Sequence, residues 1–522
     1  MINYKIKFFF LVFIPLTVIF STVHSDEQKP QNHLKKSTAV DTKTLISNSS
    51  NSVLKKKKVE ENFLGELNVN GIGLISVDST KFPEDLWSNS NEKALAEKLN
   101  NMPKLSLSST NKIFKRLLLV DAKPPLNSIG IKNMGHLFLL SRIDQLINLG
   151  AIDEAEELLN LIKEPSIDLM KRKIEVASLN GRLSKTCNLA NKYPNFKGLL
   201  QFKIICLVRK NDWQAAALAF TVGSSLGHFD EKEKQLLLNY LDPDIEYNYS
   251  TDVEINNLSP TDFYLMHGKK ALIPPDIIPN KYAYAFSELG MDPEIRIKSM
   301  EQLALNYGVN ANRLFNLYRL SSHQNKKKSY NVTRAVIELD QSFKSNSQQK
   351  RLTALYKATK IFQKKKLLAH LSNEYRDQLK NLHYSNDKKL NDLAIALLSV
   401  TDSVTNQFFT LRSTNSDINC LIDIKKRIFI NYETDTDLCE LVKELNIETI
   451  KKSFPVKRNN DNQMEKGLIL LESLNLLEKG VSTEFNDLKL SLRMLTKIGL
   501  IDLVNEISTE LIALDALKKM VL

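Results

Sequence analysis

The sequence predicts an all-α protein, an α-solenoid of TPR-like helical hairpins with a second C-terminal helical lobe. Three segments align when Gly150, Gly181 and Asn211 are matched, which gives a repeat of 30 to 31 residues. Apolar residues recur at matching offsets around each of these anchors. Glycine and proline are scarce, at 16 and 15 of 522 residues, so a sandwich or barrel with many turns is disfavoured. A helix–turn–helix pattern at a fixed period is typical of stacked hairpins.

The apolar offsets are those of two helices that flank a tight turn. The residues seven and four positions before each anchor, and five and eight after it, are Ile143, Leu146, Ala155 and Leu158; Ile174, Ala177, Thr186 and Leu189; and Ile204, Leu207, Ala216 and Ala219. This spacing places them on one face of each helix. One hairpin cannot bury such a face alone, so the stack is expected to be the folding unit. A similar segment surrounds Gly499.

Residues 1–25 are predicted to be a secretory signal peptide that is cleaved near Ser25. Lys5 and Lys7 precede an apolar run of 13 residues, whereas a membrane-crossing helix needs roughly 20. Val23 and Ser25 occupy the positions that a signal peptidase reads. The protein is therefore expected in the periplasm, and an uncleaved inner-membrane anchor is the alternative.

Residues 26–80 are predicted to form a disordered, lysine-rich tether. Its run of Lys55, Lys56, Lys57 and Lys58 is either a solvated linker or a peripheral contact with inner-membrane lipid. Loss of the two leader lysines lowers the formal net charge from +12 to +10. A basic protein favours anionic partners, but export makes nucleic acid the least expected of them.

The rest of the chain is divided by the regularity of its helical pattern. The predicted parts are an N-terminal hairpin-repeat domain at 81–230, an irregular tyrosine-rich connector at 231–290, a middle helical region at 291–400, a less regular segment at 401–461 and C-terminal helical hairpins at 462–522. Trp213 opens the second helix of the third hairpin and is predicted to be a wedge between repeats.

The four cysteines are predicted to form disulfides, because their count is even and the chain is exported. Cys187 and Cys206 are almost equidistant from the turn between two predicted helices, so antiparallel packing would bring them together. Cys420 and Cys439 repeat the 19-residue separation, but their turn is off-centre. Buried free thiols are the alternative for both pairs.

Known catalytic, cofactor and metal motifs are absent from the sequence, so no catalytic residue, metal ligand or cofactor is predicted. The most uneven feature is a concentration of tyrosines between residues 240 and 318. Tyrosine offers a flat apolar ring with a polar tip, which suits peptide or sugar faces. The possible ligand surface consists of Tyr247, Tyr249, Tyr264, His267, Tyr282 and Tyr284. The alternative is that these residues pack the connector against the helices.

Several phrases together resemble an uncharacterised exported all-helical repeat family of alphaproteobacteria, some of whose members carry an automatic antifreeze-type label. They are FPEDLWSNSNEKALAEKLNNMP, IFKRLLLVDAKPP, SPTDFYLMHGKKALIPPDIIP and LALNYGVNANRLFNLY, together with the paired Cys187 and Cys206. The resemblance implies a bacterial periplasmic setting and an all-α fold. It transfers no activity, and the flat threonine-bearing repeats of antifreeze surfaces are absent.

Two functions are compatible with these patterns. The favoured one is a periplasmic interaction scaffold that binds a protein or peptide partner without catalysis, as solenoids commonly do. The alternative is a peptidoglycan-binding accessory or a lytic cell-wall enzyme that uses the tyrosine-rich middle region. An acidic side chain buried in a cleft among the tyrosines would favour the alternative. An extended apolar groove without a buried acid would favour the scaffold.

Overall fold

The computed structural model of the chain describes most residues from 69 onward. The described ranges are 69–126, 136–163, 165–190, 199–242, 258–268, 278–287, 292–324, 331–408, 413–427, 437–452 and 464–521. All of them belong to one compact unit, Leu64–Leu522. The predicted signal peptide and the run from Lys55 to Lys58 lie outside the described residues, so their roles stay predictions.

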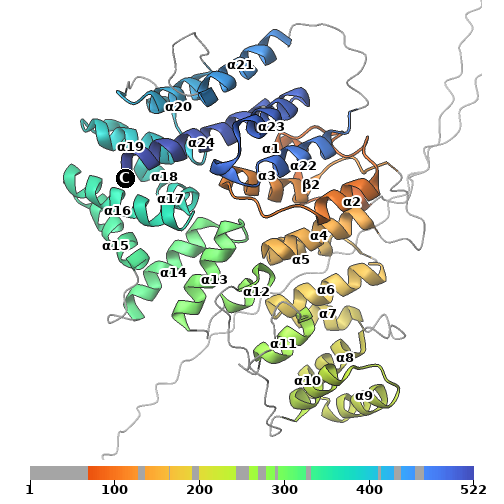
Figure 1. The fold of residues 1–522 in the computed structure, drawn as a ribbon. Coiled ribbons are helices and arrows are strands. Elements are labelled where there is room, and N and C mark those ends of the chain that lie inside the picture. The colour runs from red at the N-terminus through yellow and green to blue at the C-terminus, as the bar shows by residue number, and fades with distance from the viewer. Residues whose placement is uncertain are drawn as a thin grey trace, which may run out of the picture. The chain divides into compact units, whose positions relative to one another are not determined.

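The described residues form an all-α protein, as predicted (Figure 1). Within the described ranges, strand pairing is limited to a two-residue sheet and one isolated bridge. In the sheet, β1 (Ile75–Ser76) runs parallel to β2 (Val120–Asp121). The bridge joins Asn91 to Leu126.

The N-terminal part of the unit begins earlier than the sequence indicated. Its helices are η1 (Val69–Gly71), α1 (Val77–Thr80), α2 (Glu92–Asn100) and α3 (Ser108–Leu119). A Cβ atom on Gly73 would lie 2.2 Å from the carbonyl carbon of Val120, so only glycine lets this backbone approach the end of α3 so closely. Residues 69–80 therefore belong to the folded unit, whereas the tether was predicted to extend to residue 80.

Arg142 joins this first segment to α3. Its Nε donates to the carbonyl of Leu118 at 2.8 Å, and its Nη2 donates to that of Val120 at 2.9 Å. Its Nη1 donates to the carbonyls of Ile72 at 2.8 Å and Asn70 at 3.1 Å. The guanidinium is fully buried, so its charge is compensated mainly by carbonyl dipoles from both segments.

The three predicted hairpins are present. Their helices are α4 (Leu137–Leu149), α5 (Ile152–Asn160), α6 (Ile167–Asn180), α7 (Leu183–Ala190), α8 (Leu200–Arg209) and α9 (Trp213–Ser225). The three anchor residues lie in the turns with left-handed backbone, with φ of 76° at Gly150, 70° at Gly181 and 62° at Asn211. Glycine adopts this conformation freely, and asparagine is among the residues that tolerate it best.

The repeated isoleucines lie in the core, as their spacing predicted. Ile143, Ile174 and Ile204 are all buried. Each helix from α4 to α10 (Glu231–Leu241) contacts the next one along the chain. The prediction for Trp213 is wrong, because this side chain is exposed at the start of α9 and does not form a wedge between repeats.

The predicted connector, 231–290, contains regular helices within its described residues. Besides α10, these are α11 (Pro260–Gly268) and α12 (Asn280–Phe286). A capping box begins α10: the Asp230 side chain accepts from the Glu233 backbone N–H at 2.7 Å, and the Glu233 carboxylate accepts from that of Asp230 at 3.0 Å. Both other helices pack on the repeat domain. Helix α11 contacts α6 and α10, and α12 contacts α4, α6 and the following helix α13 (Pro293–Leu305).

The remaining helices fill the second half of the chain. They are α14 (Ala311–Gln324), α15 (Asn331–Lys344), α16 (Gln348–Lys364), α17 (Leu368–Glu374), α18 (Arg376–Lys380), η4 (Asn381–Tyr384), α19 (Lys388–Ser399), η5 (Asn406–Phe408), α20 (Ser416–Lys426), α21 (Asp437–Lys452), α22 (Lys466–Leu476), η7 (Gly480–Ser482), α23 (Phe485–Lys497) and α24 (Ile501–Val521). The segment predicted to be less regular, 401–461, thus contains the helix pair α20 and α21.

Both predicted disulfides are formed. Cys187 in α7 is bonded to Cys206 in α8, with their Cα atoms 5.6 Å apart. Cys420 in α20 is bonded to Cys439 in α21, with a Cα separation of 6.3 Å. Each bond joins two helices that are consecutive in the chain, which is the arrangement that the equal separations indicated. Two disulfides indicate an oxidising compartment, extracellular or periplasmic.

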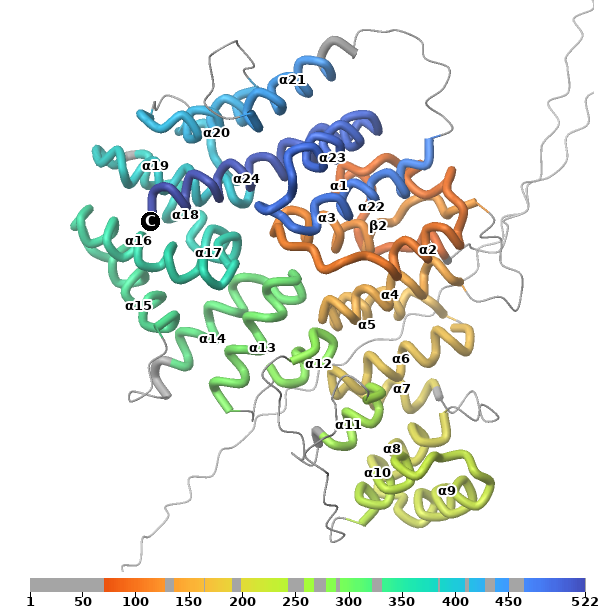
Figure 2. Tube along the Cα trace, viewed as in Figure 1, coloured from red at the N-terminus to blue at the C-terminus, as the bar shows by residue number. Residues whose placement is uncertain are grey.

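The first and last helices of the unit lie side by side (Figure 2). Helix α22 packs on α2, and α24 packs on α3 as well as on α19, α20, α21 and α23. Ion pairs join the two ends, with Lys466 2.8 Å from Asp85 and Arg116 2.9 Å from Glu506. Stacking of neighbours therefore holds from α4 to α10, while a solenoid arrangement of the whole unit stays a prediction.

Candidate functional site

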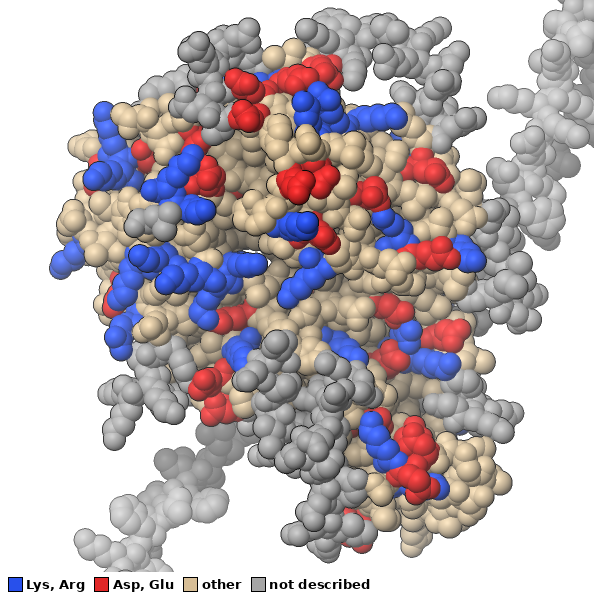
Figure 3. Space-filling model, viewed as in Figure 1, with Lys and Arg blue, Asp and Glu red and all other residues tan. Residues whose placement is uncertain are grey.

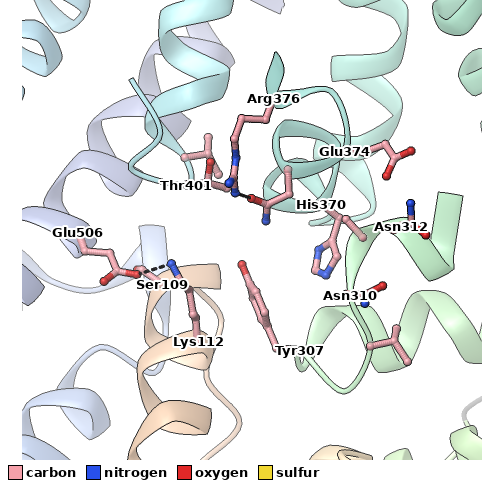
Figure 4. Close-up of a pocket in the computed structure, with 14 residues that line it drawn as sticks. Ser109, Lys112, Tyr307, Asn310, Asn312, His370, Glu374, Arg376, Thr401 and Glu506 are labelled. Carbon is pink, nitrogen blue, oxygen red and sulfur yellow. Dashed lines mark hydrogen bonds and ion pairs between the residues drawn. The ribbon is translucent and has the colours of Figure 1, made fainter. Parts of the chain in front are cut away.

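A cavity of about 560 Å³ lies where five parts of the chain meet (Figure 4). Its walls come from α3, from the turn between α13 and α14 with the start of α14, from α17 with the first residue of α18, from the two residues after α19, and from α24. This volume is within the range of small-molecule sites in proteins. The cavity is thus the first candidate for a binding site among the described residues.

Charged side chains on its walls are mostly paired. Lys112 lies 3.1 Å from Glu506, which also accepts from Arg116 at 2.9 Å. On the opposite side, Glu374 accepts from Arg319 at 2.6 Å. Both carboxylates are already bound by cations, so the cavity offers no free acidic group to a ligand.

Asparagines supply the neutral polar groups of the cavity. The Asn310 side-chain oxygen accepts from the backbone N–H of Arg313 at 2.9 Å and so caps α14. The corresponding oxygens of Asn312 and Asn373 accept from Asn316 and Arg376. In each case the bond occupies the carbonyl end of the amide. The three amide nitrogens make no hydrogen bond within the described part of the chain and remain available as donors.

His370 is the most deeply buried polar side chain of the cavity wall. It is 2% exposed, and its ring centroid lies 5.1 Å from that of Tyr307. The imidazole hydrogen-bonds to the backbone of Val309, whereas its Nδ1 has no partner among the described residues. The bond is therefore made by Nε2–H. Burial lowers the pKa of His370 to about 4, which leaves a neutral ring with a free acceptor at Nδ1.

A buried carboxylate lies behind this wall. Glu510 of α24 accepts from the backbone N–H groups of Ser108 at 2.8 Å and Ser109 at 2.6 Å. Helix α3 begins after Leu107, whose side chain cannot cap it, so Glu510 takes the place of an N-cap residue. Burial raises the pKa of Glu510, and the N–H donors oppose this shift.

Tyr307 connects the cavity to this carboxylate. Its hydroxyl forms a hydrogen bond with the Ser108 side chain, and its pKa is raised first by burial and then by the charge of Glu510. A second cavity of about 620 Å³ lies beyond Ser108 and Glu510 and has several leucines in its wall. Glu510 is thus a buried acid beside one tyrosine of the predicted cluster, but both of its oxygens are occupied by α3.

The predicted tyrosine surface is divided by the structure. Tyr282 is a core residue that stacks on Phe263 at 4.2 Å and donates to the Leu258 carbonyl at 2.5 Å. Tyr284 is also buried, and its hydroxyl donates to the carboxylate of Asp153 at 2.9 Å. These two rings pack the connector against the helices and are not ligand-binding faces.

The other residues of that predicted surface have different environments. Tyr264 is half-buried in α11, where its hydroxyl lies 3.3 Å from Nη1 of Arg209. His267 lies in the same helix, and its side chain is outside the described residues, as are Tyr247 and Tyr249 entirely. Among the described residues, no group of three or more His, Cys, Asp or Glu side chains could hold a metal ion.

The cavity residues were not identified from the sequence. Tyr307 is one of several tyrosines between residues 240 and 318, and nothing in the sequence distinguishes His370 from the other histidines. They belong to segments more than sixty residues apart, and Ser109 and Glu506 are further still along the chain. Only Asn310 carries a local signal, because an asparagine directly before a helical pattern is a typical N-cap residue.

None of the described helices is both long enough and apolar enough to span a membrane. Comparisons of the chain with protein-family models, with curated proteins and with solved structures find no match.

Proposed function

We propose that this protein is an exported, periplasmic scaffold of helical hairpins that binds a partner protein through the outer face of α9. The observation that carries the proposal is an apolar helix face that no other described part of the chain covers. Leu218 is 65% exposed, Leu226 63%, Val222 48% and Trp213 44%. Large exposed apolar patches on a folded protein typically mark an interaction site.

The amphipathicity of α9 is reversed. Its fully buried residues are the small Ala216 and Gly223, and Phe220 is half-buried and stacks on Phe229. Its other large residues, Trp213, Leu218 and Val222, are exposed. A Cβ atom on Gly223 would lie 2.6 Å from both Leu200 and the Phe229 ring, so the inner face of α9 is closely packed. The exposure of Leu218 and Leu226 is therefore not caused by loose packing of α9. These side chains do not contribute to the core of the unit, which favours a role in binding.

The outer face has the form that a second helix requires. Leu218, Val222 and Leu226 are four residues apart and form one ridge, and the exposed small residues Ala217, Thr221 and Ser225 form the adjacent row. Ridges with this spacing pack into the grooves of another helix in the commonest class of helix pairing. The matching occupant is an apolar helical ridge of a partner protein.

Charge supports the same occupant. Residues 213–227 contain no lysine, arginine, aspartate or glutamate. The space-filling view accordingly shows an uncharged region over α9 at the lower right, beside a charged cluster (Figure 3). A charged peptide or a polyanion would find no complementary group here, and an apolar helix would lose no solvated charge on docking.

The periplasmic assignment rests on two supports. The disulfides between Cys187 and Cys206 and between Cys420 and Cys439 require an oxidising compartment. The predicted leader at 1–25 supplies the route of export. Together they favour the periplasm, where a scaffold can hold a partner beside the inner membrane, with the run from Lys55 to Lys58 as a possible lipid contact.

The proposal is tested by photocrosslinking in living cells. A photoreactive amino acid at Val222 should capture one recurrent protein, and mass spectrometry should map the crosslink to an apolar ridge on one of its helices. Leu218→Lys should abolish the capture. Leu320→Lys on α14 is the matched control, because Leu320 is 61% exposed and Leu218 is 65% exposed.

Several outcomes would contradict the proposal. These are crosslinks only to a second copy of the chain, crosslinks only to residues 8–20 of the same chain, recovery of wall fragments without a protein, and equal loss of capture in both lysine variants. The first two would assign the face to self-association or to the leader. Recovery of wall fragments would favour the cell-wall function instead.

A further inference from the structure

We infer that the cavity between His370 and the asparagines at the start of α14 and in α17 is a binding site for a polyhydroxylated ligand, a saccharide residue. Nothing in the proposed scaffold function requires this site, and the inference does not depend on α9. It rests on which hydrogen-bonding groups remain unused around the cavity and on which charges are already compensated.

The acceptor at the base of the site is the first step of the argument. Nδ1 of His370 is buried and has no partner in the described residues, while the other ring nitrogen bonds to the Val309 backbone. A buried acceptor without a partner is costly, and the cost is removed by a ligand that brings an O–H or N–H group. The structure therefore favours a ligand that donates at this point.

The donors of the site are the second step. Asn310, Asn312 and Asn373 each use the side-chain oxygen for a bond within the protein. Their amide groups are left with N–H donors at the cavity. A ligand that fits both sides must accept from amides and donate to imidazole. Hydroxyl groups do both, and a saccharide carries several of them on one small ring.

Charge disfavours a cationic ligand. Glu506 is bound by Lys112 and Arg116, and Glu374 is bound by Arg319, so a cation would find no free carboxylate. Arg376 also lines the cavity, and the described residues give its guanidinium a hydrogen bond to the Asn373 side-chain oxygen but no carboxylate, so it adds a donor for the oxygen atoms of a ligand. A ligand with several hydroxyl groups and no positive charge matches these groups.

The volume of the cavity and the aromatic rings in its wall also suit a saccharide. The cavity volume of about 560 Å³ is sufficient for a small ligand. Tyr307 stands between Lys112 and His370 in Figure 4, and its ring and that of His370 lie side by side. These rings supply an apolar surface against which the C–H face of a sugar packs.

The test uses the mature full-length protein with its disulfides intact. Glucose, N-acetylglucosamine and the β-1,4-linked dimer of N-acetylglucosamine are titrated, and binding is followed by ligand-observed NMR. At least one of them should bind. Asn312→Leu should raise its Kd about tenfold, the effect of losing one or two hydrogen bonds. His370→Phe, which keeps a ring but removes Nδ1, should raise the Kd at least as much.

Two controls keep the result interpretable. Asn331→Leu replaces an exposed asparagine at the start of α15, outside the cavity, and should leave the Kd unchanged. Asn312 is exposed, so its leucine variant should fold even if the His370 variant does not. The inference would be overturned if none of the three sugars bound, or if Asn331→Leu lost as much affinity as Asn312→Leu.

Discussion

At the scale of single residues, the most demanding group in the protein is the buried guanidinium of Arg142. Its four hydrogen bonds to carbonyl groups match the rigid fork of arginine, which no other side chain reproduces. Burial lowers the pKa of Arg142 to about 10, so the group stays charged at neutral pH. Its carbonyl partners belong to two segments, and the charge therefore fixes their relative position.

We expect Arg142→Lys to lower the free energy of unfolding by about 2 to 3 kcal/mol, because lysine leaves buried carbonyls without donors. The control is Arg182→Lys, since Arg182 is 56% exposed and pairs with Asp153 and Glu156 at the surface. Its change should be under about 1 kcal/mol. Urea unfolding measures both, and equal effects of the two variants would contradict the role given to Arg142.

Glu510 is a buried group of the opposite charge. Burial disfavours its carboxylate form, while the first N–H groups of α3 favour that form. Burial is the larger effect, so the folded pKa lies above the unfolded one. A carboxyl group of this kind binds more protons in the folded state than in the unfolded state. Its contribution to stability is therefore largest at low pH and falls as the pH rises from the unfolded pKa through the folded pKa.

Glu510→Gln removes this titration while it keeps the shape of the side chain. We expect the stability of the wild type minus that of the variant to decrease as the pH is raised from about 4 to about 7. Urea midpoints of both proteins at each pH give this difference. A difference that increases over the same range would mean that the N–H donors of α3 outweigh burial and lower the pKa instead.

At the scale of elements, the hairpins are set by residues that permit a left-handed turn. Gly150, Gly181 and Asn211 all have positive φ, but their surroundings differ. A Cβ atom on Gly150 would lie 2.4 Å from a methyl group of Leu303 and 2.9 Å from the Asn280 carbonyl oxygen, whereas Gly181 has nothing within 4 Å. The first turn is packed against α12 and α13, and the second is open.

This difference gives a graded prediction. Gly181→Ala should destabilise the protein by about 1 to 2 kcal/mol, the cost of a left-handed conformation alone. Gly150→Ala should cost clearly more, because the methyl group also displaces Leu303. Gly181→Asn, which copies the residue found at position 211, should cost less than Gly181→Ala. Thermal or urea unfolding ranks the three variants, and equal losses at positions 150 and 181 would refute the argument.

The same elements show what sequence patterns can predict. The turn anchors, the buried isoleucines and both cysteine pairs follow from local spacing, so they were predictable. The exposure of Trp213 was not predictable, because a pattern of apolar residues cannot tell that α9 buries Ala216 and Gly223 fully and exposes most of its large residues. The cavity was not predictable either, since His370, Tyr307 and Ser109 meet only when distant helices pack together.

At the scale of the whole unit, the two ends of the described chain support each other. Helix α22 packs against the segment before α2, where a Cβ atom on Gly467 would lie 2.6 Å from the Trp87 ring and 2.9 Å from the Leu86 carbonyl oxygen. Lys466 pairs with Asp85, and Lys98 pairs with Glu472. In an open stack of hairpins, the terminal repeats would contact only their neighbours.

The contact between the ends makes a prediction about which regions unfold together. Gly467→Val should force α22 away from Trp87 and raise amide hydrogen exchange in α2 and α3 as well as in α22, while exchange in α8 to α10 stays unchanged. Leu490→Val on the exposed side of α23 is the control, because it adds a β-branched residue to a neighbouring helix without touching this contact. If only α22 exchanged faster, the ends would be neighbours that fold separately. If α2 and α3 respond, the stability of the N-terminal helices depends on residues nearly four hundred positions away in the sequence.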